Sequence, residues 1–151
     1  MINLSPRSLT AMQGIHPDLA RVIRRAASIA TPAQDFTVLE GLRSRETMAS
    51  NYGKGRTAAE CTAKGVDPKY AQPSLAKVTW LNDPFKSNHG QKADGYGHAC
   101  DIMPYPIDWH DMTRIHALVA LMKEAAALEK VAIVCGADWS TPDLDHFELA
   151  A

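Results

Sequence analysis

Two short segments of the sequence concentrate side chains that can bind a metal ion. The first runs from His89 to Asp101 and also contains Asp94 and His98. The second is DLDH, which ends at His146. Histidine nitrogens and carboxylate oxygens both suit zinc, and a catalytic zinc site needs three protein ligands and one position open for water. His89, Asp101 and His146 would supply such a set.

The DLDH segment also offers two candidates for a general base. Asp143 lies three residues before His146, so it could sit beside the bound water without being a ligand and accept its proton. Asp145 is the rival, but alternation along an extended chain would point it away from the face of His146. Spacing alone is weak support, because this is not the HExxH pattern that places two histidines on one helix face. Ordinary polar loops remain the alternative.

Hydrophobic periodicity indicates the elements that must position these residues. Short strands without a regular βαβ alternation predict an α+β fold with a small, mostly antiparallel sheet and flanking helices. The expected helices cover residues 17–30, 44–52 and 108–129, with a short one before Pro17. The expected strands cover residues 36–44, 78–80, 99–103, 131–136 and 146–149. Residues 53–79 are expected to form a long loop with room for one helical turn, suited to substrate selectivity.

Composition limits the class of protein. A chain of 151 residues with 46% hydrophobic residues predicts one domain, spanning residues 1–151. A net charge of -1 argues against nucleic acid as a partner. The three scattered cysteines, Cys61, Cys100 and Cys135, predict reduced structural thiols. Neither a membrane span nor a signal peptide is apparent, so we expect a protein made in the cytosol.

The site residues and the segments around them resemble a known family. Ser87-Asn88-His89, the G-x-A-x-D pattern of residues 97–101 and the D-x-x-H pattern of residues 143–146 look like the zinc peptidases of the D-alanyl-D-alanine carboxypeptidase and VanY type. The segments YGKGRT, VTW, GADW and HFEL are similar to the phage endolysin branch of that family, the L-alanyl-D-glutamate peptidases. The resemblance runs from about residue 17 to residue 149, in the expected order.

The resemblance implies a hedgehog-like zinc peptidase fold and a role for each site residue. One zinc ion would be held by His89, Asp101 and His146, with Asp143 as general base and then general acid. Arg43, delivered by the strand 36–44, would stabilise the tetrahedral oxyanion, with Arg45 as its rival. The residues expected to contact substrate are Ser87, His98, Arg56 and Tyr52, with Thr57 and Trp80 along the groove and Trp139 packed beneath the site.

The resemblance also implies a substrate. Enzymes of this branch cut the stem peptides of bacterial peptidoglycan, commonly between L-alanine and D-glutamate. The chain would then be a monomeric endolysin that waits in the host bacterial cytoplasm and reaches the wall through a permeabilised membrane. Two alternatives stay open: a D,D-carboxypeptidase that removes terminal D-alanine, and a catalytically silent module that binds wall peptide.

One departure from the family pattern concerns the first ligand. Many relatives have a shorter spacer between the first histidine and the aspartate. An ungapped alignment would place Asp94 where that histidine stands. A gapped alignment keeps Ser87-Asn88-His89 intact and assigns the extra residues to a Gly/Lys/Asp loop, so we expect His89 to be the ligand.

Overall fold

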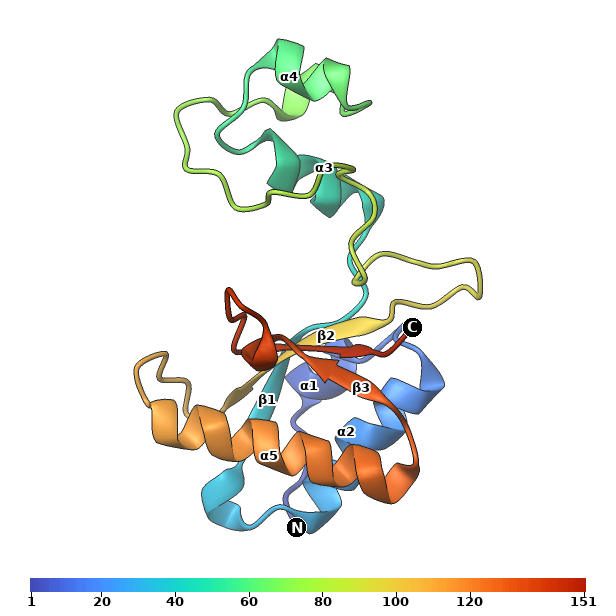
Figure 1. The fold of residues 1–151 in the computed structure, drawn as a ribbon, viewed down its shortest axis with the longest axis vertical. Coiled ribbons are helices and arrows are strands. Elements are labelled where there is room, and N and C mark those ends of the chain that lie inside the picture. Colours follow the sequence, from blue (N-terminus) through green and yellow to red (C-terminus); the bar gives the residue numbers. More distant parts are fainter.

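The computed structural model describes all residues from 1 to 151 as a body built around one sheet, with a smaller helical lobe above it (Figure 1). The body contains helices α1 (Pro6–Ala11), α2 (Pro17–Ile29) and α5 (Met112–Glu129). Its strands are β1 (Phe36–Glu40), β2 (Ala99–Pro104), β3 (Ile133–Cys135) and β4 (His146–Leu149). The lobe contains α3 (Arg45–Gly53) and α4 (Ala58–Ala63). Single 3-10 turns lie at Pro32–Gln34, Pro68–Tyr70 and Gly136–Asp138.

The sheet has the strand order β1-β2-β4-β3, and each neighbouring pair is antiparallel. The predicted α+β fold with a small antiparallel sheet is therefore confirmed. β2 lies at the centre, and its Asp101 is the direct partner of His146 on β4. On its other side, β2 pairs with β1, whose register shifts at a bulge between Val38 and Glu40, and Glu40 then pairs with Asp101. The sheet thus brings the two metal-capable segments together.

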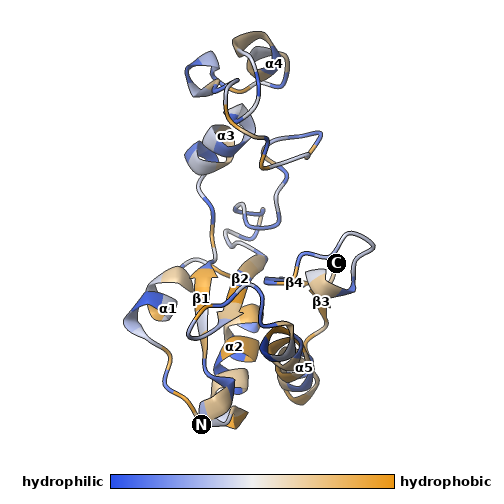
Figure 2. Ribbon diagram, turned by 90° about the vertical axis from the view of Figure 1, so that its left-hand side faces the viewer, coloured by the Kyte–Doolittle hydropathy of each residue, from blue (hydrophilic) through white to orange (hydrophobic).

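The core of the body lies where α2 and α5 pack together beside the sheet. Leu19, Val22, Ile23 and Ala26 form a fully buried stripe at helical spacing on α2. Phe147 on β4 is also fully buried and belongs to the same core. Figure 2 shows hydrophobic residues gathered in β1, β2 and α2, while the lobe is more polar. The body therefore forms the well-packed support of the site.

The lobe has its own small cluster of buried residues, made of Ala49, Tyr52, Cys61 and Val66. The guanidinium of Arg56 lies 4.0 Å from the centre of the Tyr52 ring and donates hydrogen bonds to the carbonyl oxygens of Tyr52 and Thr79, each 2.8 Å long. These contacts tie α3 to the segment that returns from the lobe to the body.

Four sequence-based boundaries or elements were wrong. Residues 78–80 form no strand, because β propensity alone does not make one without a neighbouring strand to pair with. The region 53–79 holds α4, which begins with a capping box between Thr57 and Glu60, a signal present in the sequence as T-x-x-E. The strand expected at 36–44 ends at Glu40. The last helix begins at Met112, where Asp111 caps it, and not at residue 108.

Candidate functional site

The structure brings His89, Asp101 and His146 together at the end of the sheet. Nε2 of His89 lies 3.2 Å from Oδ1 of Asp101, and Nδ1 of His146 lies 3.3 Å from the same oxygen. The two histidine nitrogens are 3.3 Å apart. His89 and His146 are buried, and Asp101 is mostly so. These three side chains could hold a metal ion and are called the metal centre below.

The donor atoms of the metal centre fit a zinc ion. Zinc bound tetrahedrally at about 2.0–2.1 Å from each ligand holds the ligand atoms about 3.3–3.4 Å apart. The three separations in this structure, 3.2, 3.3 and 3.3 Å, match that value. Two imidazoles and a carboxylate are also a ligand set that occurs in catalytic zinc sites. The residues present therefore fit zinc without rearrangement.

Hydrogen bonds around the centre orient both histidines. Nδ1 of His89 lies 2.9 Å from the carbonyl oxygen of Gly41, which can only accept, so that nitrogen carries the proton and Nε2 is left as a ligand. Nε2 of His146 lies 2.8 Å from Oε2 of Glu148, which likewise leaves Nδ1 free for the metal. Asn88 donates to the same carboxylate oxygen at 2.9 Å.

Glu148 was not identified from the sequence. A usable signal was present, because residues 146 and 148 are two apart on a strand and point to the same face. A carboxylate that accepts a proton from a ligand histidine is a recurrent feature of zinc sites.

Hydrogen bonds within the centre shift the pKa values of Asp101 and His146 so that their charged forms are favoured. Burial alone would raise the pKa of Asp101, but hydrogen bonds with His146 and His89 outweigh it and hold the pKa well below its usual range. Burial lowers the pKa of His146, yet hydrogen bonds with Asp101 and Glu148 raise it to about 8. Without metal, the centre therefore holds an ionised carboxylate and a readily protonated imidazole.

Asp143 reaches the site through a turn. The backbone N–H of His146 donates to the carbonyl oxygen of Asp143 at 3.3 Å, so residues 143–146 fold back and the extended geometry assumed from the sequence is absent. Asp143 lines the cleft and Asp145 does not. Burial, then the charge of Asp101 and the contact with Asp143, raise the pKa of Asp145 to about 7. Gly136 lies against this turn, and an added Cβ there would collide with the Asp143 carbonyl oxygen.

Arg43 lies at the edge of the metal centre. Its Nε and Nη2 donate to the two oxygens of Glu40, at 2.6 and 2.9 Å, and Nη2 lies 4.0 Å from Oδ2 of Asp101. The hydrogen bond to Glu40 raises the pKa of Arg43. The rival candidate, Arg45, stacks on Phe85 at 3.7 Å from the ring centre. Arg43 is therefore the arginine held beside the metal centre.

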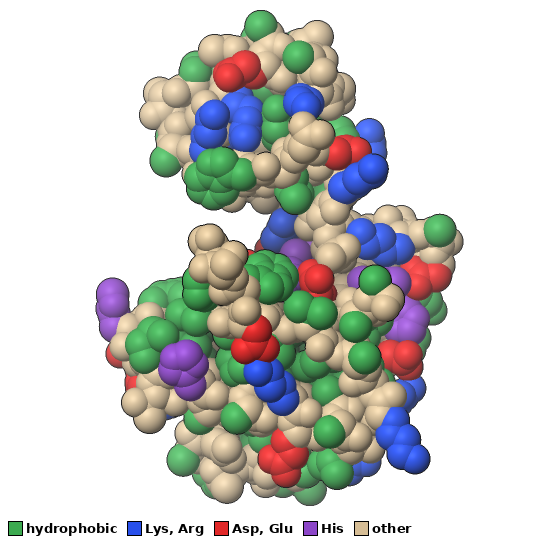
Figure 3. Space-filling view, in the orientation of Figure 1, with side chains coloured by type: hydrophobic (Ala, Val, Ile, Leu, Met, Phe, Trp, Pro, Cys, Tyr) green, Lys and Arg blue, Asp and Glu red, His purple; other side chains and the backbone are tan.

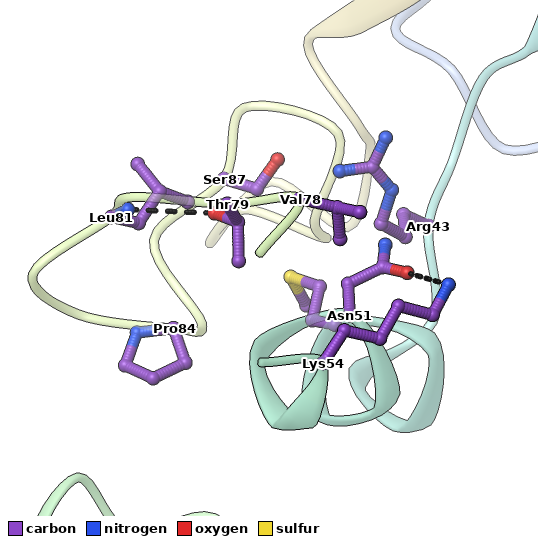
Figure 4. A pocket seen from close by; sticks show the side chains of 9 residues that line it. Arg43, Asn51, Lys54, Val78, Thr79, Leu81, Pro84 and Ser87 are labelled. Carbon is purple, nitrogen blue, oxygen red and sulfur yellow. Dashed lines mark hydrogen bonds between the residues drawn. The ribbon is translucent and has the colours of Figure 1, made fainter. Parts of the chain in front are cut away.

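The metal centre opens into a cleft of about 320 Å³ between the sheet and the segment 78–89, which returns from the lobe. Besides the three candidate ligands, Arg43, Ser87, Asp143 and Trp139 line it. A second cavity of about 240 Å³ adjoins it and shares Arg43, Val78, Leu81 and Ser87 (Figure 4). Figure 3 shows the molecule hollowed between lobe and body. The two cavities form one groove that could accept an extended peptide.

Several residues expected at the substrate groove lie elsewhere. His98 contacts Asp94, with 2.7 Å between Nε2 and Oδ2, and does not line the cleft. Tyr52 and Arg56 are buried in the lobe, and neither lines the groove. Ser87 lines the groove as expected. Trp139 also lines it and is 39% exposed, so the expectation that it packs beneath the site was wrong. Thr57 caps α4, and Trp80 is 78% exposed and lines neither cavity.

The candidate ligand that joins Asp101 and His146 is thus His89 and not Asp94. The backbone explains this arrangement, because the N–H of Arg43 donates to the carbonyl oxygen of His89 at 2.8 Å. The end of β1 and the residues after it therefore hold His89 in place through both its backbone and its ring.

Comparisons with known proteins agree with this site. Residues 1–69 match the family described as phage L-alanyl-D-glutamate peptidase. The fold is similar to the crystal structure of the Serratia marcescens L-Ala D-Glu endopeptidase ChiX, with a TM-score of 0.62 and 27% sequence identity. That similarity covers 99% of this chain and 90% of the Serratia chain. No curated protein sequence matches significantly. The sequence of the N-terminal part and the fold of nearly the whole chain therefore confirm the resemblance to phage L-alanyl-D-glutamate peptidases.

Proposed function

We propose that this protein is a zinc-dependent peptidoglycan peptidase that hydrolyses the L-alanyl–D-glutamate bond of stem peptides. The observation that carries the proposal is the metal centre, whose three donor atoms already stand at zinc spacing beside Asp143 in an open groove. The similarity to phage L-alanyl-D-glutamate peptidases and to the Serratia L-Ala D-Glu endopeptidase supports the choice of bond.

His89, Asp101 and His146 would hold the ion, which would supply Lewis acidity towards the peptide carbonyl and lower the pKa of a bound water. Asp143 is exposed at the cleft, where it accepts a proton from the attacking water and returns it to the leaving amine. The guanidinium of Arg43, fixed by Glu40, donates hydrogen bonds to the oxyanion that develops on the carbonyl. Ser87, at the junction of the two cavities, contacts the peptide.

The wider setting is part of the proposal. No helix is both long and apolar enough to cross a membrane. We infer that a single chain acts alone on the stem peptide, and that it passes from the host bacterial cytoplasm to the wall once another protein has permeabilised the membrane.

Mass spectrometry of purified peptidoglycan digested with the protein tests the proposal. We expect new L-alanine C-termini and D-glutamate N-termini that disappear with a chelator and return with zinc. Asp143→Asn should remove the products while zinc binding persists, and Asp138→Asn, an exposed aspartate of the same loop, is the matched control. Release of free D-alanine would replace the proposal with the carboxypeptidase. A folded, zinc-loaded protein that cuts nothing would leave only the wall-binding module.

A further inference from the structure

A second group of metal-capable side chains lies outside the cleft, and we propose that it binds a second divalent transition-metal ion of the zinc class. The group consists of His16, Asp94 and His98, called the peripheral cluster below. Its three donor atoms all lie within 4.8 Å of one another. Oδ2 of Asp94 is 2.7 Å from Nε2 of His98 and 3.8 Å from Nε2 of His16. The two imidazole rings meet edge to face at 5.2 Å between centres.

The backbone holds the two segments of the peripheral cluster together. The N–H of His16 donates to the carbonyl oxygen of Gly97 at 2.8 Å, and the N–H of Gly97 donates to that of Gly14 at 2.9 Å. The loop before Gly97 turns at Gly95, whose φ of +88° suits glycine. Residues far apart in sequence are thus fixed side by side before any ion arrives, which lowers the entropy cost of binding.

The carboxylate of Asp94 is already arranged as a ligand. Its Oδ1 accepts the backbone N–H of Tyr96 at 3.1 Å, which leaves Oδ2 directed at both histidines. The same backbone hydrogen bond, followed by the contact with His98, lowers the pKa of Asp94, so the group is in its ligand form at neutral pH. A tetrahedral zinc ion needs ligand atoms about 3.3–3.4 Å apart. The Asp94–His98 separation of 2.7 Å must therefore lengthen by about 0.6–0.7 Å and the Asp94–His16 separation of 3.8 Å must shorten by about 0.4–0.5 Å. The two histidine nitrogens, which lie within 4.8 Å of each other, must approach by at most about 1.5 Å.

The tautomer of His16 can also adapt to an ion. At present Nδ1 accepts the backbone N–H of Asp18 at 3.1 Å, which places the proton of a neutral ring on Nε2. Metal binding at Nε2 moves that proton to Nδ1, where it needs an acceptor. Oδ2 of Asp18 lies 3.9 Å from Nδ1, so a small rotation lets this carboxylate accept it.

The peripheral cluster is open to ions from solvent. The side chains of His16, Asp94 and His98 are 26%, 40% and 29% exposed, so an ion can enter and water can complete its shell. A bound ion would join the start of α2 to the loop that ends at β2. Since Asp101 follows three residues after His98, the ion would stabilise the entry to the strand that carries it.

Calorimetric titration of the metal-free full chain with Zn²⁺ tests the proposal, because it counts ions without measuring peptidase activity. We expect two equivalents in the wild type and one in Asp94→Asn, which keeps the acceptor for Tyr96 but removes the charged ligand. His98→Gln should behave like Asp94→Asn, and His116→Gln, an exposed histidine on α5, should keep two. Circular dichroism verifies that each variant is folded.

Two results would overturn the proposal. One is a single equivalent in the wild type at about 100 μM free Zn²⁺, where a site with a dissociation constant of about 1 μM is nearly full, that Asp94→Asn retains. The other is a second equivalent that survives in both Asp94→Asn and His98→Gln. Both results leave an ion that does not depend on the peripheral cluster, so failure here leaves the proposed peptidase function untouched.

Discussion

Replacing Glu148 with glutamine should weaken zinc binding without removing a ligand. Glu148 accepts the Nε2 proton of His146 at 2.8 Å and a hydrogen bond from Asn88 at 2.9 Å. The carboxylate fixes the tautomer in which Nδ1 faces the ion and makes the imidazole a stronger ligand for the metal. Glutamine keeps the size and one acceptor oxygen but carries no charge, so it separates the electrostatic contribution of the residue from its packing.

The expected loss follows from the type of contact. A hydrogen bond to a charged group contributes about 1.5–3 kcal/mol. Glutamine retains a neutral hydrogen bond worth about 1 kcal/mol, so the difference is about 0.5–2 kcal/mol. At about 1.4 kcal/mol for each factor of ten, the dissociation constant for zinc should rise about 2–30-fold. Losses of about 10–100-fold are typical when such outer partners are removed from metal sites.

Competition with a chromophoric chelator measures the dissociation constant for zinc directly. Glu124→Gln, an exposed glutamate on α5, controls for the change in net charge. Thermal unfolding of the metal-free proteins separates a loss of affinity from a loss of fold. An affinity for Glu148→Gln within twofold of the wild type would refute the argument that this carboxylate tunes His146.

Three further predictions concern the proton, the turn and the arginine. Because the pKa of His146 is raised to about 8, its imidazole carries a proton below that pH, which zinc must displace. The affinity for zinc should therefore fall about tenfold per pH unit down to pH 6. A zinc affinity that does not change with pH in chelator competition would contradict this. Gly136→Ala should destabilise the fold by about 1–3 kcal/mol, because the added Cβ displaces Asp143, and a melting temperature equal to the wild type would contradict it. Glu40→Gln should lower turnover about tenfold without changing the affinity for zinc, because Arg43 loses its charged partner. Unchanged turnover would count against the role of Arg43.

The sequence predicted the elements whose patterns are local. The stripe of α2, the long helix α5 and the strands β2 and β4 follow from periodicity and from segments short enough to be read alone. The failed strand at residues 78–80 and the end of β1 at Glu40 depend on pairing with distant segments. No periodicity within the segment itself reveals whether a neighbouring strand exists.

The site residues also divide into those that the sequence could predict and those that it could not. His89, Asp101 and His146 could be proposed because the resemblance names the ligand types in their order. The positions of Tyr52 and Arg56 could not, because both residues serve the small core of the lobe, whose packing depends on the unforeseen helix α4. His98 was misplaced for a related reason: its partners, Asp94 and His16, come together only through the backbone contacts of Gly97.

The geometry of the metal centre is a property of the sheet register more than of any sequence motif. Asp101 and His146 are direct partners across β2 and β4, so their separation is set by backbone pairing. A slip of one residue would turn His146 to the opposite face and dismantle the centre. The third candidate ligand, His89, is fixed by two hydrogen bonds to the residues after β1. Its Nδ1 bonds to the carbonyl oxygen of Gly41, and its carbonyl oxygen accepts the N–H of Arg43. The irregular end of β1 thus places a candidate ligand and the arginine together, which explains why zinc spacing exists before an ion binds.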